Sequence, residues 1–432
     1  MKWKLSPRKA VPLATVTGLV LIGGFLHPTS AAPPSARLAS NPSSRWFQSW
    51  GAAMQRPQAG NEDNGPNWST EGFRNHSLRQ VIRMSAGGTR VRIRLSNLYG
   101  TKPLKVAGAT IGRSAGGAKA WPGTVVPLTF GGGRSAVVRP GGELAGDPMP
   151  LATSPLEKLV VTLRFTEATG PAAFHRFTPQ PAYRASGDHL SDVGSDAYGE
   201  STDALYYLSG VDVPDEGAAG QGTVVAFGDS LVDGVGSAHG ADGRLPDMLA
   251  ERLAAARRPL GVVNAGIGGN RLRHDSSCGG DRATARFGRD ALDRPGVRAV
   301  LVHLGANDIR DTPGDPCLRP GGPATARQVI DAQRRLIRAA RARGVKVVGA
   351  TVLPLKGALF PVWTPQVEKV RDAVNHWIRT GGEYDAVVDV DRILADPADR
   401  DRPRLAYVYE DGLHPNDAGY QAIARAIDLR AL

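Results

Sequence analysis

The second half of the chain alternates short apolar runs with longer amphipathic stretches, and this alternation constrains the fold more than any other feature. The apolar runs have strand length, and the apolar residues between them recur at helical spacing. Strands that alternate with helices build a parallel sheet with both faces covered. We therefore predict an α/β domain over residues 223–432. Its expected strands cover 224–227, 262–264, 299–304, 345–352 and 386–390, and its expected helices cover 246–257, 325–343, 365–379 and 416–428.

The first half has a different pattern, because short segments of alternating polar and apolar residues are separated by glycine-rich turns. The alternation is clearest from Arg90 to Leu95, and turn signals recur at 86–88, 131–133 and 140–142. Short strands between such turns favour a β-sandwich-like domain over residues 46–211. Residues 212–222 are predicted to be a linker. A chain of 432 residues is long enough for two such domains.

The first 31 residues are predicted to be a secretory signal peptide. A basic start is followed by a mostly apolar run over 11–26 and by the small residues 29–31 as a cleavage site. We expect residues 32–45 to be flexible and the mature protein to be secreted, without a transmembrane segment. Cleavage lowers the formal net charge of +12 by four, to +8. A basic exported protein suits anionic surfaces, and no nucleic-acid motif is present.

Two cysteines, Cys278 and Cys317, are the only ones in the chain. In an exported protein such a pair is predicted to form a disulfide. The bridge would close a loop of about 40 residues and contribute on the order of 4 kcal/mol. A metal site would need more ligands than the sequence shows, so we predict neither a metal nor a cofactor.

Four short motifs in the α/β half contain the residue types of a serine esterase. Ester hydrolysis through an acyl-enzyme needs a nucleophile, a base, a group that orients the base and donors for the oxyanion. Each motif alone is typical of a turn, but the combination favours catalysis. In chain order the motifs are Gly-Asp-Ser-Leu at 228–231, Asn-Ala-Gly-Ile-Gly-Gly-Asn at 264–270, Gly-Ala-Asn-Asp at 305–308 and Asp-Gly-Leu-His-Pro at 411–415.

The predicted catalytic residues are Ser230, Asp411 and His414. Ser230 follows an apolar run, so its hydroxyl is expected at the carboxyl end of a strand, where open parallel sheets bind ligands. His414 is the predicted base. Asp411 lies three residues earlier and is close enough to accept a hydrogen bond from the imidazole, which fixes the tautomer. Ser230 is preceded at two positions by Gly228 but followed at two by Val232, which does not match the Gly-x-Ser-x-Gly elbow of α/β-hydrolases.

In order and spacing, the four motifs resemble blocks I, II, III and V of the SGNH (GDSL) hydrolase family. The resemblance implies a three-layer α/β/α, flavodoxin-like domain with a five-stranded parallel sheet. It makes Ser230 the nucleophile, His414 the base and Asp411 its partner. It also implies an oxyanion hole formed by the backbone N–H groups of Ser230 and Gly269 and the side-chain amide of Asn307. Gly268 is the alternative to Gly269, because the two glycines are adjacent.

Residues 44–50 and 78–84 resemble the β-rich domain that precedes the catalytic domain in some secreted bacterial SGNH esterases. Four tryptophans of the predicted domain 46–211 would stack on sugar rings if they were exposed, and would otherwise belong to the core. The alternative is a structural domain that covers one edge of the catalytic sheet or narrows the mouth of the active site. The tryptophans are Trp46, Trp50, Trp68 and Trp121.

Residues 264–272 resemble the second block of the arylesterase and carbohydrate acetyl-esterase subgroup. We therefore expect a secreted serine esterase that cleaves short-chain acyl or acetyl esters, with an acylated polysaccharide or a lipid as substrate. A lipase or phospholipase that acts on longer acyl chains is the first alternative. A non-catalytic carbohydrate- or surface-binding protein is the second. The natural substrate and the oligomeric state stay open.

Overall fold

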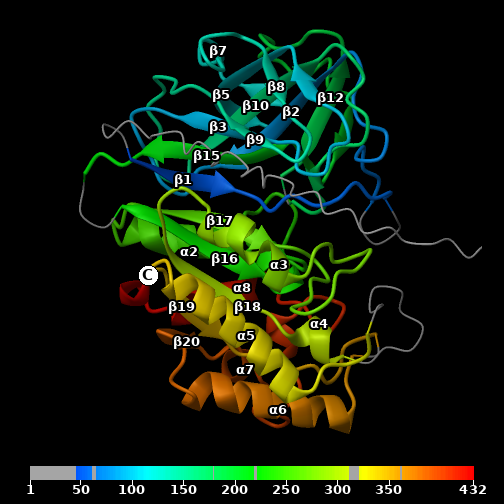
Figure 1. Ribbon diagram of the computed structural model, residues 1–432, viewed down its shortest axis with the longest axis vertical. Helices are drawn as coiled ribbons and strands as arrows, with labels where there is room; N and C mark the ends of the chain where they lie inside the picture. The colour runs from blue at the N-terminus through cyan, green and yellow to red at the C-terminus, as the bar shows by residue number, and fades with distance from the viewer. Residues whose placement is uncertain (1–44, 61–64, 179, 218–220, 311–320, 361) are drawn as a thin grey trace, which may run out of the picture. The chain divides into compact units, whose positions relative to one another are not determined.

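The computed structural model describes residues 45–432 except 61–64, 179, 218–220, 311–320 and 361 (Figure 1). The predicted signal peptide, residues 1–31, lies outside the described residues, as does all but the last residue of the segment 32–45. Residues Ser43–Leu432 form one compact unit. In the part of the chain that is described, no helix is both long and apolar enough to cross a membrane.

A five-stranded parallel sheet organises the second half of the chain, and its strand order is β17-β16-β18-β19-β20. Every residue of β16 and of its neighbour β17 is buried, as expected for a parallel sheet with both faces covered. The fold class and the flavodoxin-like order are confirmed, and the predicted strands differ from the observed ones by a few residues at their ends. The strands are β16 (Gly222–Gly228), β17 (Leu260–Gly266), β18 (Val297–His303), β19 (Lys346–Ala350) and β20 (Ala386–Val388).

Four long helices pack on this sheet, close to their predicted positions. They are α2 (Leu245–Ala255), α5 (Ala326–Arg341), α6 (Pro365–Thr380) and α8 (Asp417–Ala426). Helix α2 contacts α8, and α5 contacts α6. Side-chain caps define three of the starts: Thr325 accepts from Gln328 N, Thr364 from Val367 N and Asn416 from Gly419 N.

Several helices of one or two turns were not predicted, because a segment this short does not contain a full amphipathic period. Two of them follow strands and carry residues of the predicted site, namely α1 after β16 and α4 after β18. These helices are α1 (Ser230–Asp233), α3 (Ala283–Phe287), η1 (Gly288–Leu292), α4 (Ala306–Ile309), α7 (Val390–Leu394), η3 (Leu405–Tyr407) and η4 (Leu429–Ala431).

The first half consists of antiparallel sheets, as predicted. One sheet contains β1 (Trp46–Gly51), β15 (Leu208–Pro214), β3 (Arg92–Ser96) and β9 (Glu143–Ala145) in that order. The other contains β13 (Glu200–Thr202), β12 (Ala182–Ser186), β2 (His76–Arg83), β10 (Lys158–Phe165), β5 (Gly108–Gly116) and β6 (Lys119–Ala120), with β7 (Val126–Pro127) paired to β5. Two small pairs complete it: β4 (Leu104–Val106) with β8 (Ala136–Val138), and β11 (Phe174–His175) with β14 (Leu205–Tyr206). One core cluster joins residues of both large sheets.

The predicted linker 212–222 overlaps strand residues at both ends, because β15 continues to Pro214 and β16 begins at Gly222. Asp212 resembles a loop residue in the sequence, yet its side chain is fully buried. It is tolerated inside β15 because Arg92 and Arg94 each approach its carboxylate to 2.8 Å.

The β-rich part covers the β17 edge of the parallel sheet, which is one of the two structural roles expected for it. Strand β1 lies beside β17 (Figure 1), and Ala52 forms a parallel bridge with Asn264. The approach is so close that a Cβ on Gly261 would lie 1.9 Å from the carbonyl oxygen of Gln48. A covered edge strand cannot pair with another chain.

The four tryptophans do not form a shared exposed platform. Trp68 is only 6% exposed and stacks on Tyr206, whereas Trp121 is 58% exposed. Trp50 packs against the core, and the guanidinium of Arg92 lies 4.4 Å from the ring of Trp46. Most of these aromatic side chains therefore serve packing.

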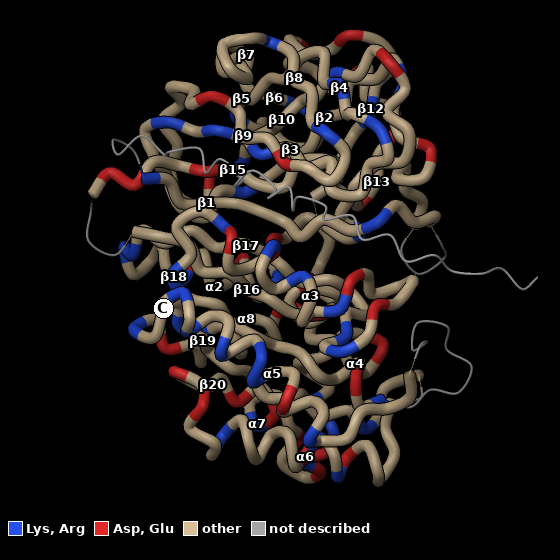
Figure 2. Tube along the Cα trace, viewed as in Figure 1, with Lys and Arg blue, Asp and Glu red and all other residues tan. Residues whose placement is uncertain are grey.

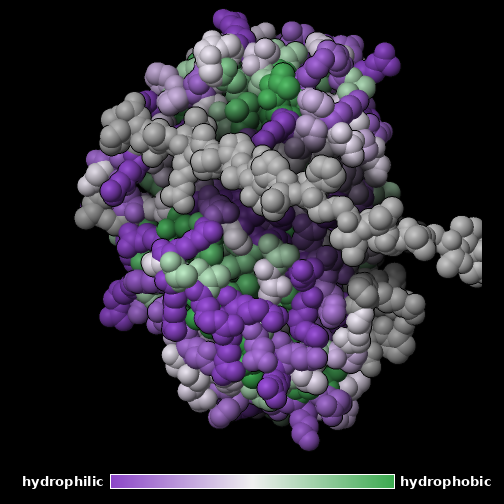
Figure 3. Space-filling view, in the orientation of Figure 1, coloured by the Kyte–Doolittle hydropathy of each residue, from purple (hydrophilic) through white to green (hydrophobic). Residues whose placement is uncertain are grey.

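Charged residues are dispersed over the surface. Lys and Arg interleave with Asp and Glu along the chain (Figure 2). The face over α5 and α6 is mainly hydrophilic (Figure 3), and ion pairs such as Arg334 with Glu383 at 2.7 Å lie there. The arginines of α5 therefore lie on a solvated face of the helix, where carboxylates form ion pairs with some of them.

Candidate active site

Ser230 lies at the carboxyl end of β16, as predicted, and is the first residue of the one-turn helix α1. Asp229 caps this turn by accepting the backbone N–H of Leu231 at 3.1 Å. The turn is tight, because a Cβ on Gly228 would lie 2.4 Å from Val232 and 2.6 Å from the carbonyl oxygen of His303. A glycine is therefore required where the chain leaves the strand.

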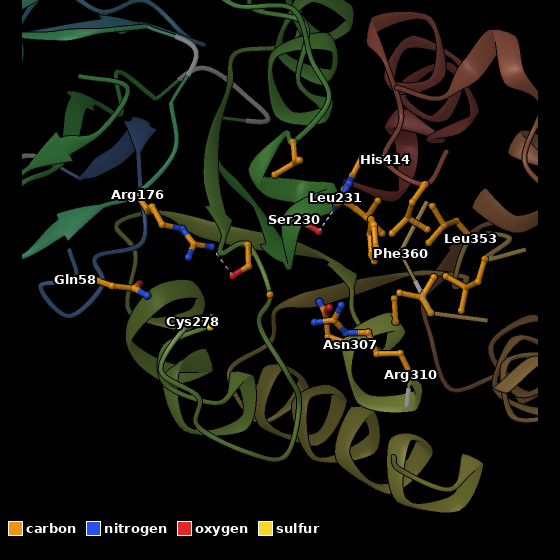
Figure 4. A pocket seen from close by; sticks show the side chains of 17 residues that line it. Gln58, Arg176, Ser230, Leu231, Cys278, Asn307, Arg310, Leu353, Phe360 and His414 are labelled. Carbon is orange, nitrogen blue, oxygen red and sulfur yellow. Dashed lines mark hydrogen bonds between the residues drawn. The ribbon is translucent and has the colours of Figure 1, made fainter. Parts of the chain in front are cut away.

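The three predicted catalytic residues form one hydrogen-bonded chain. Ser230 Oγ lies 2.8 Å from His414 Nε2 (Figure 4), and His414 Nδ1 lies 2.5 Å from Asp411 Oδ2. The other oxygen of Asp411 accepts the backbone N–H groups of Leu413 and His414 at 2.9 and 3.0 Å. Burial alone would raise the pKa of Asp411, but these hydrogen bonds and the adjacent imidazole outweigh it and hold the pKa below its ordinary value. The carboxylate is therefore ionised at neutral pH.

Ser230 and His414 line a cavity of about 290 Å³. In Figure 4, Gln58 and Arg176 lie on one side of Ser230, and Leu353 and Phe360 lie on the other. The apolar residues are Leu231, Val235, Leu353, Leu355, Phe360, Val362 and Leu413, and the long polar ones are Gln58, Arg176, Asn307 and Arg310. Phe360 is close to the catalytic chain, with its ring centroid 6.5 Å from that of His414.

Two of the predicted oxyanion donors are also at this cavity. Asn307 Nδ2 donates to the carbonyl oxygen of Asn270 at 3.2 Å. Its second contact, to Asp229 Oδ2 at 3.4 Å, is longer than an ordinary hydrogen bond, so that hydrogen can be donated to an oxyanion instead. The backbone N–H of Gly268 donates to Asp233 Oδ2 at 2.8 Å, so it is occupied. Gly269 adopts a left-handed φ of +74°, and its N–H has no hydrogen-bond partner among the described residues. The geometry thus favours Gly269 over Gly268 as the donor.

Two buried carboxylates support the loops of the site. Both oxygens of Asp308 accept the backbone N–H of Leu272, at 3.1 and 2.9 Å. Burial raises the pKa of Asp308 to about 6 and that of Asp229 to about 7. His303, which the sequence places among apolar strand residues, is buried in β18, and this burial lowers its pKa to about 4.

Arg286 is a structural residue of the site that sequence reasoning missed. It is completely buried, and it donates to the carbonyl oxygens of Gly228 at 2.8 Å and Ala265 at 2.9 Å and to Asn270 Oδ1 at 3.0 Å. Its guanidinium also lies 4.1 Å from the ring of Phe227. One side chain thus joins the ends of β16 and β17. No local pattern marks this arginine among the many others.

The β-rich part also reaches the site, through residues that no sequence signal indicated. His175 Nε2, at the end of β11, lies 2.9 Å from Asp233 Oδ1, and both side chains are 1% exposed. The next residue, Arg176, donates from Nη2 to the carbonyl oxygen of Gly268 at 3.1 Å. Arg176 and Gln58 thus bring the β-rich part into the lining of the cavity.

Cys278 lines the cavity. Its predicted partner Cys317 belongs to residues 311–320, which lie outside the described residues. The disulfide stays a prediction.

The model of the GDSL-like Lipase/Acylhydrolase family matches residues 226–422. This span begins in β16, ends in α8 and contains Ser230, Asn307, Asp411 and His414. Residues 226–422 are a GDSL-like lipase/acylhydrolase domain. The GDSL domain has the α/β fold that the sequence predicted, and the family match supports an ester hydrolase of the SGNH/GDSL type.

Solved structures resemble the GDSL domain at low sequence identity. A lipase/acylhydrolase from Enterococcus faecalis is 18% identical with a TM-score of 0.36, and the match covers 47% of this chain and 92% of that one. An aryl esterase from M. smegmatis is 16% identical with a TM-score of 0.37, covering 48% and 95%. A carbohydrate acetylesterase from Sinorhizobium meliloti is 14% identical with a TM-score of 0.37, covering 47% and 95%. No curated protein sequence matches the chain.

Proposed function

We propose that the protein hydrolyses short-chain carboxylic esters through an acyl-enzyme on Ser230. The observation that carries this proposal is the hydrogen-bonded chain from Ser230 through His414 to Asp411 at the wall of a cavity. The nucleophile, the base and the group that orients the base are then in the geometry that acyl transfer requires.

In the proposed mechanism, Ser230 Oγ attacks the ester carbonyl carbon while His414 Nε2 accepts the hydroxyl proton. Asp411 stabilises the imidazolium that forms. The oxyanion of the tetrahedral intermediate accepts hydrogen bonds from the backbone N–H groups of Ser230 and Gly269 and from the side-chain amide of Asn307. When the intermediate collapses, His414 returns the proton to the leaving alcohol. Water then attacks the acyl-enzyme with His414 as base, and the carboxylic acid is released.

The cavity supports a small acyl group. Its volume of about 290 Å³ lies just below the range of about 300–1,000 Å³ for ligand pockets. The apolar lining residues suit the acyl chain, and Gln58, on the other side of Ser230 from Phe360, suits a hydroxyl-bearing alcohol portion, such as an acylated polysaccharide. We further propose that the protein is secreted, because the first 31 residues have the pattern of a signal peptide.

Hydrolysis of longer acyl chains is the second candidate function. The apolar lining of the cavity favours it, since one segment of the chain supplies several of the apolar lining residues. They are Leu353, Leu355, Phe360 and Val362. A lipase-type substrate would place its acyl chain along this segment.

The test is hydrolysis of p-nitrophenyl esters from acetate to palmitate by the secreted protein and by Ser230→Ala. Ser237→Ala is the matched control, because Ser237 donates to the carbonyl oxygen of Gly234 instead of contacting His414. We expect activity to be greatest on acetate, to persist in Ser237→Ala and to fall by at least about 1,000-fold in Ser230→Ala. Equal activity of wild type and Ser230→Ala would refute the mechanism. A maximum at long chains would select the lipase alternative, and an inactive wild type would favour the binding-protein alternative.

A further inference from the structure

The peptide unit between Gly268 and Gly269 carries the proposed oxyanion donor at one end and a hydrogen bond to Arg176 at the other. Arg176 Nη2 donates to the carbonyl oxygen of Gly268 at 3.1 Å (Figure 4). A peptide group is planar and trans, so its C=O and its N–H point in opposite directions. When Arg176 holds the carbonyl of Gly268 on its own side, the N–H of Gly269 is directed to the other side.

Two adjacent glycines make this peptide easy to turn over. Glycine adopts positive and negative φ with similar ease, and Gly269 already has a φ of +74°. In the turned-over state, a carbonyl oxygen would replace the N–H that faces the developing oxyanion and would repel it. The backbone N–H of Gly268 is held separately by Asp233 at 2.8 Å, but that bond does not fix the following peptide. A second restraint is needed, and Arg176 supplies it.

Arg176 is itself held by the β-rich part of the protein. Its backbone N–H donates to Gln55 Oε1 at 2.9 Å. The preceding residue, His175, has Nδ1 2.9 Å from the carbonyl oxygen of Ala53 and Nε2 2.9 Å from Asp233 Oδ1. The backbone that carries the guanidinium is therefore anchored before a substrate arrives, as a group that orients an active site must be.

We propose that Arg176 is a positioning residue that holds the Gly268–Gly269 peptide with the N–H of Gly269 directed at the oxyanion. The inference rests on the proposed function, because it assumes that Gly269 is a donor in ester hydrolysis at Ser230. The charged hydrogen bond also polarises the peptide group and strengthens its N–H as a donor. The β-rich part thus completes the active site of the GDSL domain in addition to covering an edge strand.

The experiment compares Arg176→Met and Arg176→Lys with wild type in hydrolysis of p-nitrophenyl acetate. Loss of an oxyanion donor typically costs about 100–1,000-fold in kcat. We expect a smaller loss of about 10–100-fold in Arg176→Met, because the donor is misdirected rather than removed, with KM within about twofold of wild type. Arg176→Lys should regain part of the lost kcat, since an ammonium group can also donate to the carbonyl of Gly268. A boronic acid that forms a tetrahedral adduct with Ser230 should lose affinity in parallel with kcat/KM.

Arg83→Met is the matched control. Arg83 also belongs to the β-rich part and reaches across to the GDSL domain, donating to Glu251 at 2.9 Å, but it does not line the cavity. We expect it to keep the wild-type kcat, with thermal unfolding reporting that each variant is folded. If Arg176→Met fails to fold, Arg176→Ala takes its place, because alanine also lacks a donor for the carbonyl oxygen of Gly268. A folded Arg176→Ala with wild-type kcat and wild-type boronic acid affinity would overturn the inference.

Two outcomes in folded variants would overturn the role of Arg176. Unchanged kcat in Arg176→Met would show that the peptide needs no such restraint. Raised KM with unchanged kcat would show that Arg176 binds substrate instead. In either case an inactive Ser230→Ala would leave the proposed function standing, whereas an active Ser230→Ala would reject the proposed function itself.

Discussion

The carboxylate of Asp233 accepts the backbone N–H of Gly268 at 2.8 Å, and this hydrogen bond distinguishes Gly268 from the adjacent Gly269, the predicted oxyanion donor. Because the donor of Gly268 is occupied, the N–H of the next glycine is the one available at the cavity. The second oxygen of Asp233 lies 2.9 Å from His175 Nε2. One buried carboxylate thus connects helix α1, the glycine loop and the β-rich part.

Asp233→Ala is expected to reduce both stability and activity. An alanine has no acceptor oxygen, so the backbone N–H of Gly268 and the ring of His175 both lose their partner in a buried place. Breaking a buried pair costs about 3 kcal/mol or more, and release of Gly268 should lower kcat by at least about tenfold. Urea unfolding and p-nitrophenyl acetate kinetics measure the two effects. A variant as stable and as active as wild type would contradict this account of the loop.

Asp411→Asn is expected to lower kcat by up to about 10⁴-fold, because an amide that faces Nδ1 favours the wrong tautomer of His414. Stability should change by less than about 1 kcal/mol, since the asparagine oxygen can still accept the backbone N–H groups of Leu413 and His414. Kinetics and urea unfolding of the same preparation separate the two quantities. Near-wild-type kcat would show that Asp411 does not orient the base.

The pH dependence of stability should report the buried carboxyl of Asp229. Its folded pKa is raised to about 7, whereas an unfolded aspartate has a pKa of about 3.9. Between these values the folded protein binds the extra proton, so the free energy of unfolding falls as pH rises through this window. Asp229→Asn cannot ionise. From about pH 5 to about pH 8, wild type should therefore lose more stability than the variant in urea unfolding. Parallel curves for the two proteins would refute the raised pKa.

Val362→Trp should narrow the apolar side of the cavity. Val362 is 3% exposed and lines the cavity, so a larger side chain there takes space from the acyl group. Hydrolysis of p-nitrophenyl decanoate should fall by about tenfold or more relative to acetate. The control is Leu359→Trp, because Leu359 is 80% exposed and should leave the chain-length profile unchanged. An equal loss on both esters in Val362→Trp would place the acyl group elsewhere.

The sequence by itself determined the α/β domain and most of its candidate site. The strands of the parallel sheet and the long helices were predictable because the spacing of apolar residues within a single segment indicates a strand or a helix. Parallel strands have their carboxyl ends at one edge, so the strand pattern predicted the place of Ser230 after β16, and the family resemblance placed Asn307 at the same site. The short spacing of Asp411 and His414 likewise made their contact predictable.

Only the tertiary structure decided which glycine has its N–H occupied and which side chains hold the loops. Arg176 and Arg286 act on carbonyl groups that are far from them in the sequence, and neither residue stands in a pattern that marks its role. The same reason explains Asp212, whose burial in β15 depends on two arginines of β3. Packing between distant segments selects partners by position in space, and a linear pattern does not encode such pairings.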